Sequence, residues 1–177
     1  ALVSSGISNF EERTRAILKI EDGCDRFCSY CIIPKARGRV RWKPIEDIKN
    51  EVKALTDNGY SEIVLVGIHI ASFGRDTGEK LIDLLREFDA IDGIERIRIG
   101  SLEPTLFDDE FAEQISKLSK ICRHFHLSLQ SGCDETLKRM NRKYTTAEYM
   151  ASVKRIRKAF PDAAITTDIM VGFPGET

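Results

Sequence analysis

The sequence lacks any long apolar run. No segment of its 177 residues approaches the roughly 20 consecutive apolar residues that a helix needs to cross a bilayer. The first six residues, ALVSSG, also lack the basic and then apolar order of a signal peptide. We therefore expect a cytoplasmic protein without a membrane anchor.

Charge of one sign and evenly spread cysteines are missing as well. The formal net charge is −1, so any contact with nucleic acid must come from local patches. Three of the five cysteines stand close together, whereas the cysteines of a disulfide-stapled secreted module are spread along the chain. This clustering predicts a reducing compartment. The content of 42% hydrophobic and 31% charged residues is typical of a globular domain with a sizeable core.

The three clustered cysteines are Cys24, Cys28 and Cys31. Thiolates this close can turn toward one centre, and Gly23 lets the chain curl there at low steric cost. Iron–sulfur cubes normally take four thiolates, so three predict a cluster with one iron open to an exogenous ligand. A closed zinc site with a histidine and a redox pair of cysteines are the alternatives.

Short β-branched runs alternate with amphipathic stretches, which predicts repeated β/α units on a parallel sheet. Each expected helix has a start or stop signal, such as the capping box of Thr145 and Glu148, the cap Asp108 or the terminating Asn58-Gly59. The expected strands are 16–20, 63–70, 96–102, 124–129 and 164–171, and the expected helices are 44–58, 81–91, 108–118 and 145–160. Ligand sites in such folds gather at the carboxyl ends of the strands.

The ends of the chain predict a piece of a longer protein. Residues 1–15 are polar and are expected to be a linker or a remnant of a preceding domain. Residues 16–177 are expected to form one core domain that is incomplete at its C-terminal end, because the final Gly-Pro-Gly turn would ordinarily lead into another helix.

Five motifs in order resemble the radical S-adenosylmethionine methylthiotransferases. They are GCDRFCSYCIIPKARG (23–38), LVGIHIASFG (65–74), RIGSLEP (98–104), HLSLQSGCDETLKRMNRKY (126–144) and DIMVGFPGET (168–177). The segments 67–69 and 130–133 are most similar to the branch that acts on threonylcarbamoyladenosine in tRNA. The resemblance implies an α/β fold, a parallel partial (β/α) barrel of the radical S-adenosylmethionine type, truncated after about five β/α units.

The resemblance also implies the cofactors and the reaction. Cys24, Cys28 and Cys31 would hold a 4Fe–4S cluster with one open iron, on which S-adenosylmethionine binds. A deoxyadenosyl radical would then allow methylthiolation of threonylcarbamoyladenosine next to the anticodon. The alternatives within the family are isopentenyladenosine in tRNA and a ribosomal protein. Family members need an electron donor and carry a second 4Fe–4S cluster in a further domain, so this chain alone is expected not to complete the reaction.

Other residues at predicted strand ends are candidates for binding the cofactor. Glu103 offers a carboxylate, Gln130 and Ser131 offer an amide and a hydroxyl, and Gly172 and Gly175 allow close approach of the backbone. Plain solvated turns are the alternative for Glu103 and for the two glycines.

The remaining histidines and cysteines are expected to be structural. His69, His124 and His126 alternate with apolar residues inside the predicted strands, which favours satisfied structural side chains over ligands or bases. Cys122 and Cys133 are expected to be small buried hydrophobes.

Two basic segments are candidates for binding RNA. Arg37, Arg39, Arg41 and Trp42 follow the cysteine loop and could meet phosphates and a stacked base. The segment 138–143 is a second cluster of cations. A solvated charged rim is the alternative for both. A rival function of another class is a zinc-stabilised RNA-binding module without catalysis.

Overall fold

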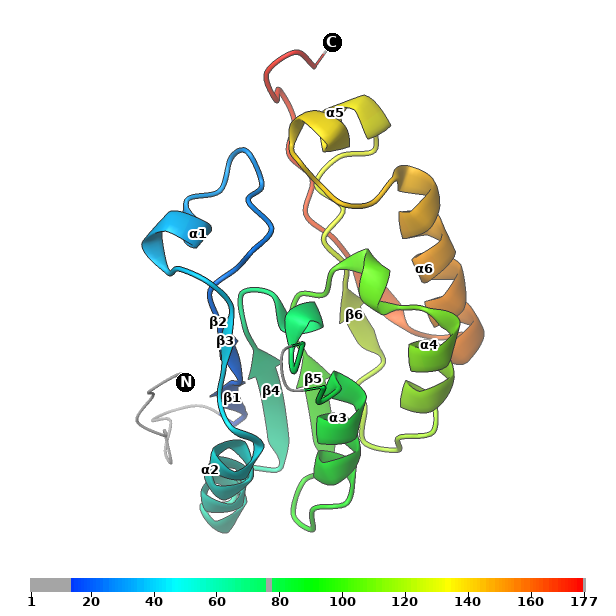
Figure 1. Cartoon of the computed structure of the whole chain (residues 1–177). Coiled ribbons are helices and arrows are strands. Elements are labelled where there is room, and N and C mark those ends of the chain that lie inside the picture. The colour runs from blue at the N-terminus through cyan, green and yellow to red at the C-terminus, as the bar shows by residue number, and fades with distance from the viewer. Residues whose placement is uncertain (1–13, 76–77, 177) are drawn as a thin grey trace.

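The computed structural model describes residues 14–75 and 78–176 (Figure 1). Parallel strands β1 (Ala16–Lys19), β4 (Glu62–Val66) and β5 (Arg96–Ile99) pair in that order. Strand β6 (His124–His126) pairs in parallel with β7 (Ala164–Thr166). Parallel bridges join Ile97 to Ile121 and Leu102 to Leu127, so the two sheets continue each other across β5 and β6.

The helices that cover the sheet are α2 (Ile45–Asp57), α3 (Leu81–Asp89), α4 (Asp109–Ile115) and α6 (Thr146–Ala159). Helices α1 (Ile33–Ala36) and α5 (Asp134–Arg139) lie beyond the carboxyl ends of the strands, at the top of Figure 1. The short pieces are the antiparallel pair β2 (Glu21–Asp22) and β3 (Arg41–Trp42) and the 3₁₀ turns η1 (Ile70–Ser72) and η2 (Pro104–Leu106).

The two faces of the sheet differ sharply in polarity. Ile63, Ile97 and Phe125 are fully buried and belong to the apolar core under the helices. Because successive side chains alternate between the faces, Glu62 and Arg98 lie on the other face, where the Arg98 Nε donates to the Glu62 Oε1 at 3.0 Å. Among the described residues no strand joins β7 back to β1, so the predicted partial barrel is confirmed.

The predicted strands and covering helices are all present. The capping box is confirmed, since the Thr145 Oγ1 accepts from the Glu148 backbone N–H at 3.2 Å and the Glu148 Oε2 accepts from the Thr145 N–H at 2.7 Å. The Asp108 cap is confirmed by its bond from the Phe111 N–H at 2.7 Å. The strands are shorter than predicted, and the pattern did not predict α1, α5 or the β2–β3 pair.

Most of the expected linker, residues 1–13 of 1–15, lies outside the described residues, as does Thr177. Within the described part of the chain, no helix is both long and apolar enough to cross a membrane.

Candidate functional site

The cysteine loop leaves the sheet through β2 and returns through β3. At its neck, Gly23 has a φ of +85°, and a Cβ there would lie 2.1 Å from the carbonyl oxygen of Arg39. The Cys24 N–H donates to the Gly38 carbonyl at 3.1 Å, which closes the neck. Glycine is therefore required at position 23, because the two arms of the loop cross there without room for a side chain.

One cavity of about 120 Å³ brings the predicted ligands together. It is lined by all three cysteines of the loop, and Glu103 lies in the same wall. Cys24 is buried, whereas Cys28 and Cys31 are partly exposed. The cavity lies where the carboxyl ends of the strands converge, as predicted for a parallel β/α fold.

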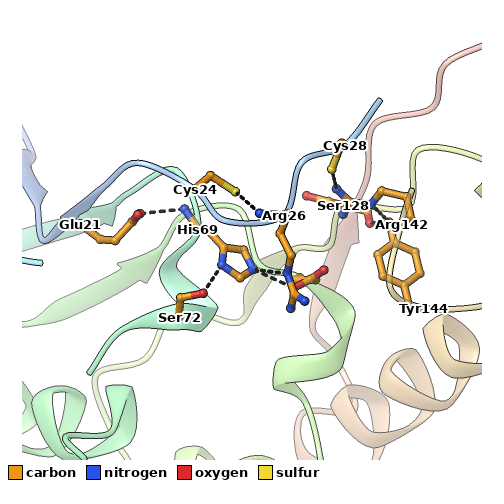
Figure 2. Close-up of polar contacts among 10 residues, drawn as sticks. Glu21, Cys24, Arg26, Cys28, His69, Ser72, Ser128, Arg142 and Tyr144 are labelled. Atoms are coloured by element: carbon orange, nitrogen blue, oxygen red, sulfur yellow. Dashed lines mark hydrogen bonds and ion pairs between the residues drawn. The ribbon is translucent and has the colours of Figure 1, made fainter. Parts of the chain in front are cut away.

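The floor of the cavity is a network of buried polar side chains, seen in Figure 2. The Arg26 guanidinium forms an ion pair with the Glu103 carboxylate, and its Nε lies 3.2 Å from the Nε2 of His69. That Nε2 atom lies 2.7 Å from the Glu103 Oε2, and the Nδ1 of His69 contacts the Ser72 hydroxyl. A ring nitrogen either donates or accepts, so Nε2 can serve Glu103 or Arg26 but not both at once.

Glu103 and Glu21 are both buried at this end of the sheet, yet their pKa values move in opposite directions. Burial works against ionisation of Glu103, but the hydrogen bond and charge of His69 and the charge of Arg26 outweigh it and hold its pKa below the ordinary value. Burial raises the pKa of Glu21, despite the bond that its Oε2 accepts from the His69 N–H at 2.7 Å. Its Oε1 is buried without a hydrogen-bond partner among the described residues.

Arg142 reaches the same cavity from the segment after α5. Its Nη1 lies 3.3 Å from the Cys28 Sγ, and its Nε lies 3.0 Å from the Tyr144 hydroxyl. Burial opposes the charge of Arg142, but Tyr144 and the Cys28 sulfur raise its pKa above the ordinary value, so it stays a cation. Burial also raises the pKa of Tyr144 to about 12, so this phenol stays neutral.

The donor set suits a sulfur-bound metal cluster with an open position. Three thiols line the cavity, and Cys122 and Cys133 do not. Among residues 14–75 and 78–176, no three His, Cys, Asp or Glu side chains are gathered around a single ion position. The thiols are instead distributed along the wall of a cavity. Burial raises the pKa of the Cys24 thiol, although its sulfur accepts a hydrogen bond from the Arg26 backbone N–H at 3.4 Å.

Four predicted binding residues do not line this cavity. The Ser131 hydroxyl is buried and accepts from the Cys133 N–H at 3.2 Å, while Gln130 has a φ of +69° and pairs by its backbone with Ile169. Gly172 and Gly175 are exposed, with positive φ angles. Ser101 and Ser128 follow the neighbouring strands β5 and β6 and line the cavity instead.

The first basic segment forms an exposed rim near the neck of the loop. Arg37 and Arg41 both approach the buried carboxylate of Asp22, at 3.8 and 3.5 Å, and Arg39 is exposed. Trp42 is paired in the β2–β3 ladder and packs against the core. Its indole is therefore partly covered, and its contact with a stacked base stays a prediction.

The structure corrects two predictions about histidine and cysteine. His69 does not lie inside a strand, because β4 ends at Val66, and its hydrogen-bonded ring lines the cavity. Cys133 is exposed at the start of α5, where bonds from Thr136 and Glu135 lower its pKa, so it is not a buried hydrophobe. Cys122 is buried as predicted, and His126 contacts the Thr166 hydroxyl at 3.1 Å.

Residues 18–177 match the sequence model of the family described as the radical SAM superfamily. The chain belongs to the radical SAM superfamily. The match begins within β1 and includes the cysteine loop and every other element that lines the cavity. The loop of three thiols is therefore the cysteine loop of a radical SAM domain, and the family confirms the predicted resemblance over nearly the whole chain.

Curated relatives of this radical SAM chain carry two kinds of name. Threonylcarbamoyladenosine tRNA methylthiotransferases of Thermotoga maritima and Bacillus subtilis are 44% and 45% identical, over 96% and 95% of this chain. A tRNA-2-methylthio-N(6)-dimethylallyladenosine synthase of Thermotoga petrophila is 48% identical over 88% of it. The chain covers only 39%, 38% and 35% of the lengths of these three relatives.

Solved structures share the fold at low sequence identity. The radical S-adenosylmethionine methyltransferase TsrM from Kitasatospora setae aligns with a TM-score of 0.69 and 21% identity, over 92% of this chain and 31% of its own. The cobalamin-dependent S-adenosylmethionine radical enzyme OxsB aligns with a TM-score of 0.69 and 14% identity, over 87% of this chain and 23% of its own. These likenesses confirm the radical SAM fold.

Sequence reasoning missed Arg26, His69 and Arg142 as members of the site. Arg26 lies between two predicted ligands, and His69 follows a predicted strand, so the rule of strand ends could have found both. Arg142 stands in a run of cations, and nothing in that run distinguishes an inward side chain from a solvated one.

Proposed function

We propose that this chain is the radical domain of a tRNA methylthiotransferase. Cys24, Cys28 and Cys31 would hold a 4Fe–4S cluster with one iron open for S-adenosylmethionine. The observation that carries the proposal is the set of three thiols around one cavity at the strand ends, in a chain of the radical SAM superfamily. When bound, the cluster and S-adenosylmethionine would supply a deoxyadenosyl radical able to take hydrogen from an unreactive C–H of an adenine.

In this proposal, side chains around the cavity position the charged groups that surround the cluster. The thiols need to be deprotonated to bind metal, and hydrogen-bond donors already face two of the sulfurs: the Arg26 backbone N–H at Cys24 and the Arg142 guanidinium at Cys28. Glu103 keeps Arg26 at the floor of the cavity, and His69 supports Glu103 from the side of Ser72. Tyr30 and Ile68 also line the cavity and present ring and aliphatic surface at its exposed side.

The substrate that we propose is threonylcarbamoyladenosine next to the anticodon. The wording of segments 67–69 and 130–133, which is most similar to that branch of the family, supports it. The dimethylallyl group is apolar and is the alternative. The full-length protein should be assayed on tRNA bearing either group, and a preference for the dimethylallyl form would overturn this choice.

The partners follow from the same proposal. The enzyme would work on tRNA in the cytoplasm and would need an electron donor. A second 4Fe–4S cluster would lie in the part of the relatives' length that this chain does not span, and residues 16–177 would be the core domain alone. Arg37, Arg39 and Arg41 form a basic rim beside the cysteine loop and would contact phosphates of the RNA.

The first test is anaerobic reconstitution with iron and sulfide. The reconstituted chain is expected to turn brown and, with dithionite and S-adenosylmethionine, to form deoxyadenosine. Cys28→Ala is expected to abolish both properties, because it removes one of three ligands. Cys133→Ala is the matched control, because this cysteine is exposed and does not line the cavity.

The outcomes separate the proposal from its rival. A colourless chain with stoichiometric zinc would contradict the radical function and support the RNA-binding module. Equal deoxyadenosine formation by Cys28→Ala and by the unchanged chain would show that the cysteine loop is not the site. Formation of methylthiolated tRNA by this chain alone would contradict the assignment of the second cluster to another domain.

A further inference from the structure

The second basic segment, residues 138–143, does not form a uniform surface. Lys138 and Lys143 are exposed, whereas Arg142 is only partly exposed and lines the cysteine cavity. A phosphate contact would use outward cations, so the segment has two parts with different surroundings. The positive charge of Arg142 is therefore directed at the cysteine cavity.

The end of α5 and the turn after it hold the middle of the cysteine loop by hydrogen bonds. The Ser29 backbone N–H donates to the Met140 carbonyl at 3.1 Å, and the Ser29 hydroxyl donates to the Arg139 carbonyl at 2.9 Å. The Asn141 side-chain amide donates to the Phe27 carbonyl at 2.8 Å. Cys28 therefore stands between two residues that are fixed to the same distant turn.

The loop adopts an unfavourable backbone conformation at this contact. Phe27 has a φ of +52°, in the left-handed region that a bulky residue rarely adopts. Asn141 has a φ of +57°, which asparagine tolerates better. Strained residues persist only when the surroundings hold them, and the bond from Asn141 to the Phe27 carbonyl is such a restraint.

The turn is itself anchored in the core and at the end of β6. Met140 is fully buried, and Tyr144 is nearly so. The Tyr144 hydroxyl donates to the Leu129 carbonyl at 2.9 Å, and the Arg142 guanidinium lies 4.9 Å above the centre of the Tyr144 ring. Arg142 is therefore held on its far side by an aromatic ring that cannot move, and its Nη1 points at the Cys28 Sγ at 3.3 Å (Figure 2).

We propose that Arg142 is a positioning residue that donates a hydrogen bond to the Cys28 sulfur and thereby raises the reduction potential of the cluster held by the loop. This inference rests on the proposed function, because it requires the cluster. A cation and a hydrogen bond at a ligand sulfur stabilise the more negative, reduced cluster relative to the oxidised one. Arg142 also bonds the Tyr144 hydroxyl, which in turn donates to the Ser128 carbonyl, so this chain of contacts connects the loop to the strand end that bears Ser128.

The test compares Arg142→Gln with Lys138→Gln after anaerobic reconstitution, without S-adenosylmethionine, so that contacts with that ligand do not enter. Lys138 is an exposed cation four residues away, and its change removes the same charge from the surface. Two quantities are to be measured. One is the iron content of each chain, and the other is the midpoint potential of the cluster, from a redox titration monitored by electron paramagnetic resonance. Arg142→Gln is expected to shift the potential to a more negative value and to lose iron faster. Lys138→Gln is expected to match the unchanged chain.

The result that overturns the inference is a cluster in Arg142→Gln with the potential and iron retention of the unchanged chain. Equal shifts in Arg142→Gln and Lys138→Gln would also overturn it, because they would reflect overall charge alone. If Arg142→Gln does not fold, Arg142→Met, whose stem still packs over the Tyr144 ring, decides by the same comparison. If the unchanged chain binds no cluster, the proposed function fails and this inference fails with it. A cluster in the unchanged chain with no effect at Arg142 removes this inference alone.

Discussion

On the helix-covered face of the sheet, Ile63, Ile97 and Phe125 are fully buried among other apolar side chains. At the carboxyl ends of the same strands, the buried side chains include Glu21, His69 and Glu103. The first region is stabilised by removal of apolar surface from water, which needs no directional contact. The second depends on directional partners, because an unpaired buried polar group is costly. Substitutions in the two regions should therefore differ in size and in their dependence on pH.

The largest effect is expected in the apolar region, from Phe125→Ala. This ring is fully buried and lies 5.2 Å from the rings of both Phe107 and Phe160. Loss of the ring and the cavity that it leaves should lower the free energy of unfolding by about 3–5 kcal/mol in urea denaturation at pH 7. The control Met150→Ala removes a half-exposed side chain and should change it by less than about 0.5 kcal/mol. A small effect of Phe125→Ala would mean that this core is not well packed.

A smaller effect with a pH dependence is expected from Glu103→Gln in the chain without added iron. The carboxylate pairs with Arg26 and His69, so its loss should lower the free energy of unfolding by about 1–3 kcal/mol at pH 7. The folded-state pKa of Glu103 lies below its ordinary value, so this stability is present above about pH 4.3 and is lost as the pH falls. Urea denaturation at pH 7 and pH 4 should show the gap between variant and unchanged chain closing. A gap independent of pH would contradict the ionised pair.

The opposite sign is expected for the pH dependence of Glu21→Gln. Burial raises the folded-state pKa of Glu21, so the folded chain holds a proton more tightly than the unfolded chain, and stability falls as the pH rises above about 4.3. The variant cannot lose a proton there. Urea denaturation from pH 4 upward should therefore show the variant gaining stability relative to the unchanged chain as the pH rises above about 4.3. A difference between the two chains that does not change above about pH 4.3 would contradict a raised pKa of Glu21.

The smallest effect is expected at an ion pair outside both regions. Glu113 and Lys117 lie 2.7 Å apart on exposed positions, where water and salt screen their charges. Glu113→Gln should leave the urea midpoint unchanged at low and high salt. A measurable loss of stability at low salt that disappears at high salt would contradict this prediction, because it would show that this exposed ion pair stabilises the fold.

The elements could be predicted from the sequence to a useful degree, because helices and strands follow from local spacing and caps. Their ends could not. The apolar alternation continues through Ile68 and Ile70, yet β4 ends at Val66. A Cβ at Gly67 would lie 2.6 Å from the Glu21 Oε2, so the chain turns where a carboxylate from another strand end occupies the space. This end of β4 is set by a tertiary contact, which the spacing of apolar residues in the sequence does not reveal.

The site could be predicted in part. The cysteine spacing predicted the three thiols, and the rule of strand ends predicted Glu103, all of which line the cavity. The same rule chose Ser131 where Ser128 lines the cavity, because the pattern does not tell which face of an irregular strand end looks inward. The positions of Gln130, Gly172 and Gly175 outside the cavity have the same origin.

By itself the sequence determined the order of strands and helices, the loop of three cysteines and the likeness to radical methylthiotransferases. Each of these features depends on residues that are close together in the sequence, through short-range hydrogen bonds, alternation of side chains or the spacing of ligands. Only the tertiary structure decided that Arg26, His69, Glu103 and Arg142 share one cavity with the thiols. These side chains come from segments spread over more than 100 residues of sequence, and their convergence depends on strand register and on the packing of the core, which no local pattern specifies.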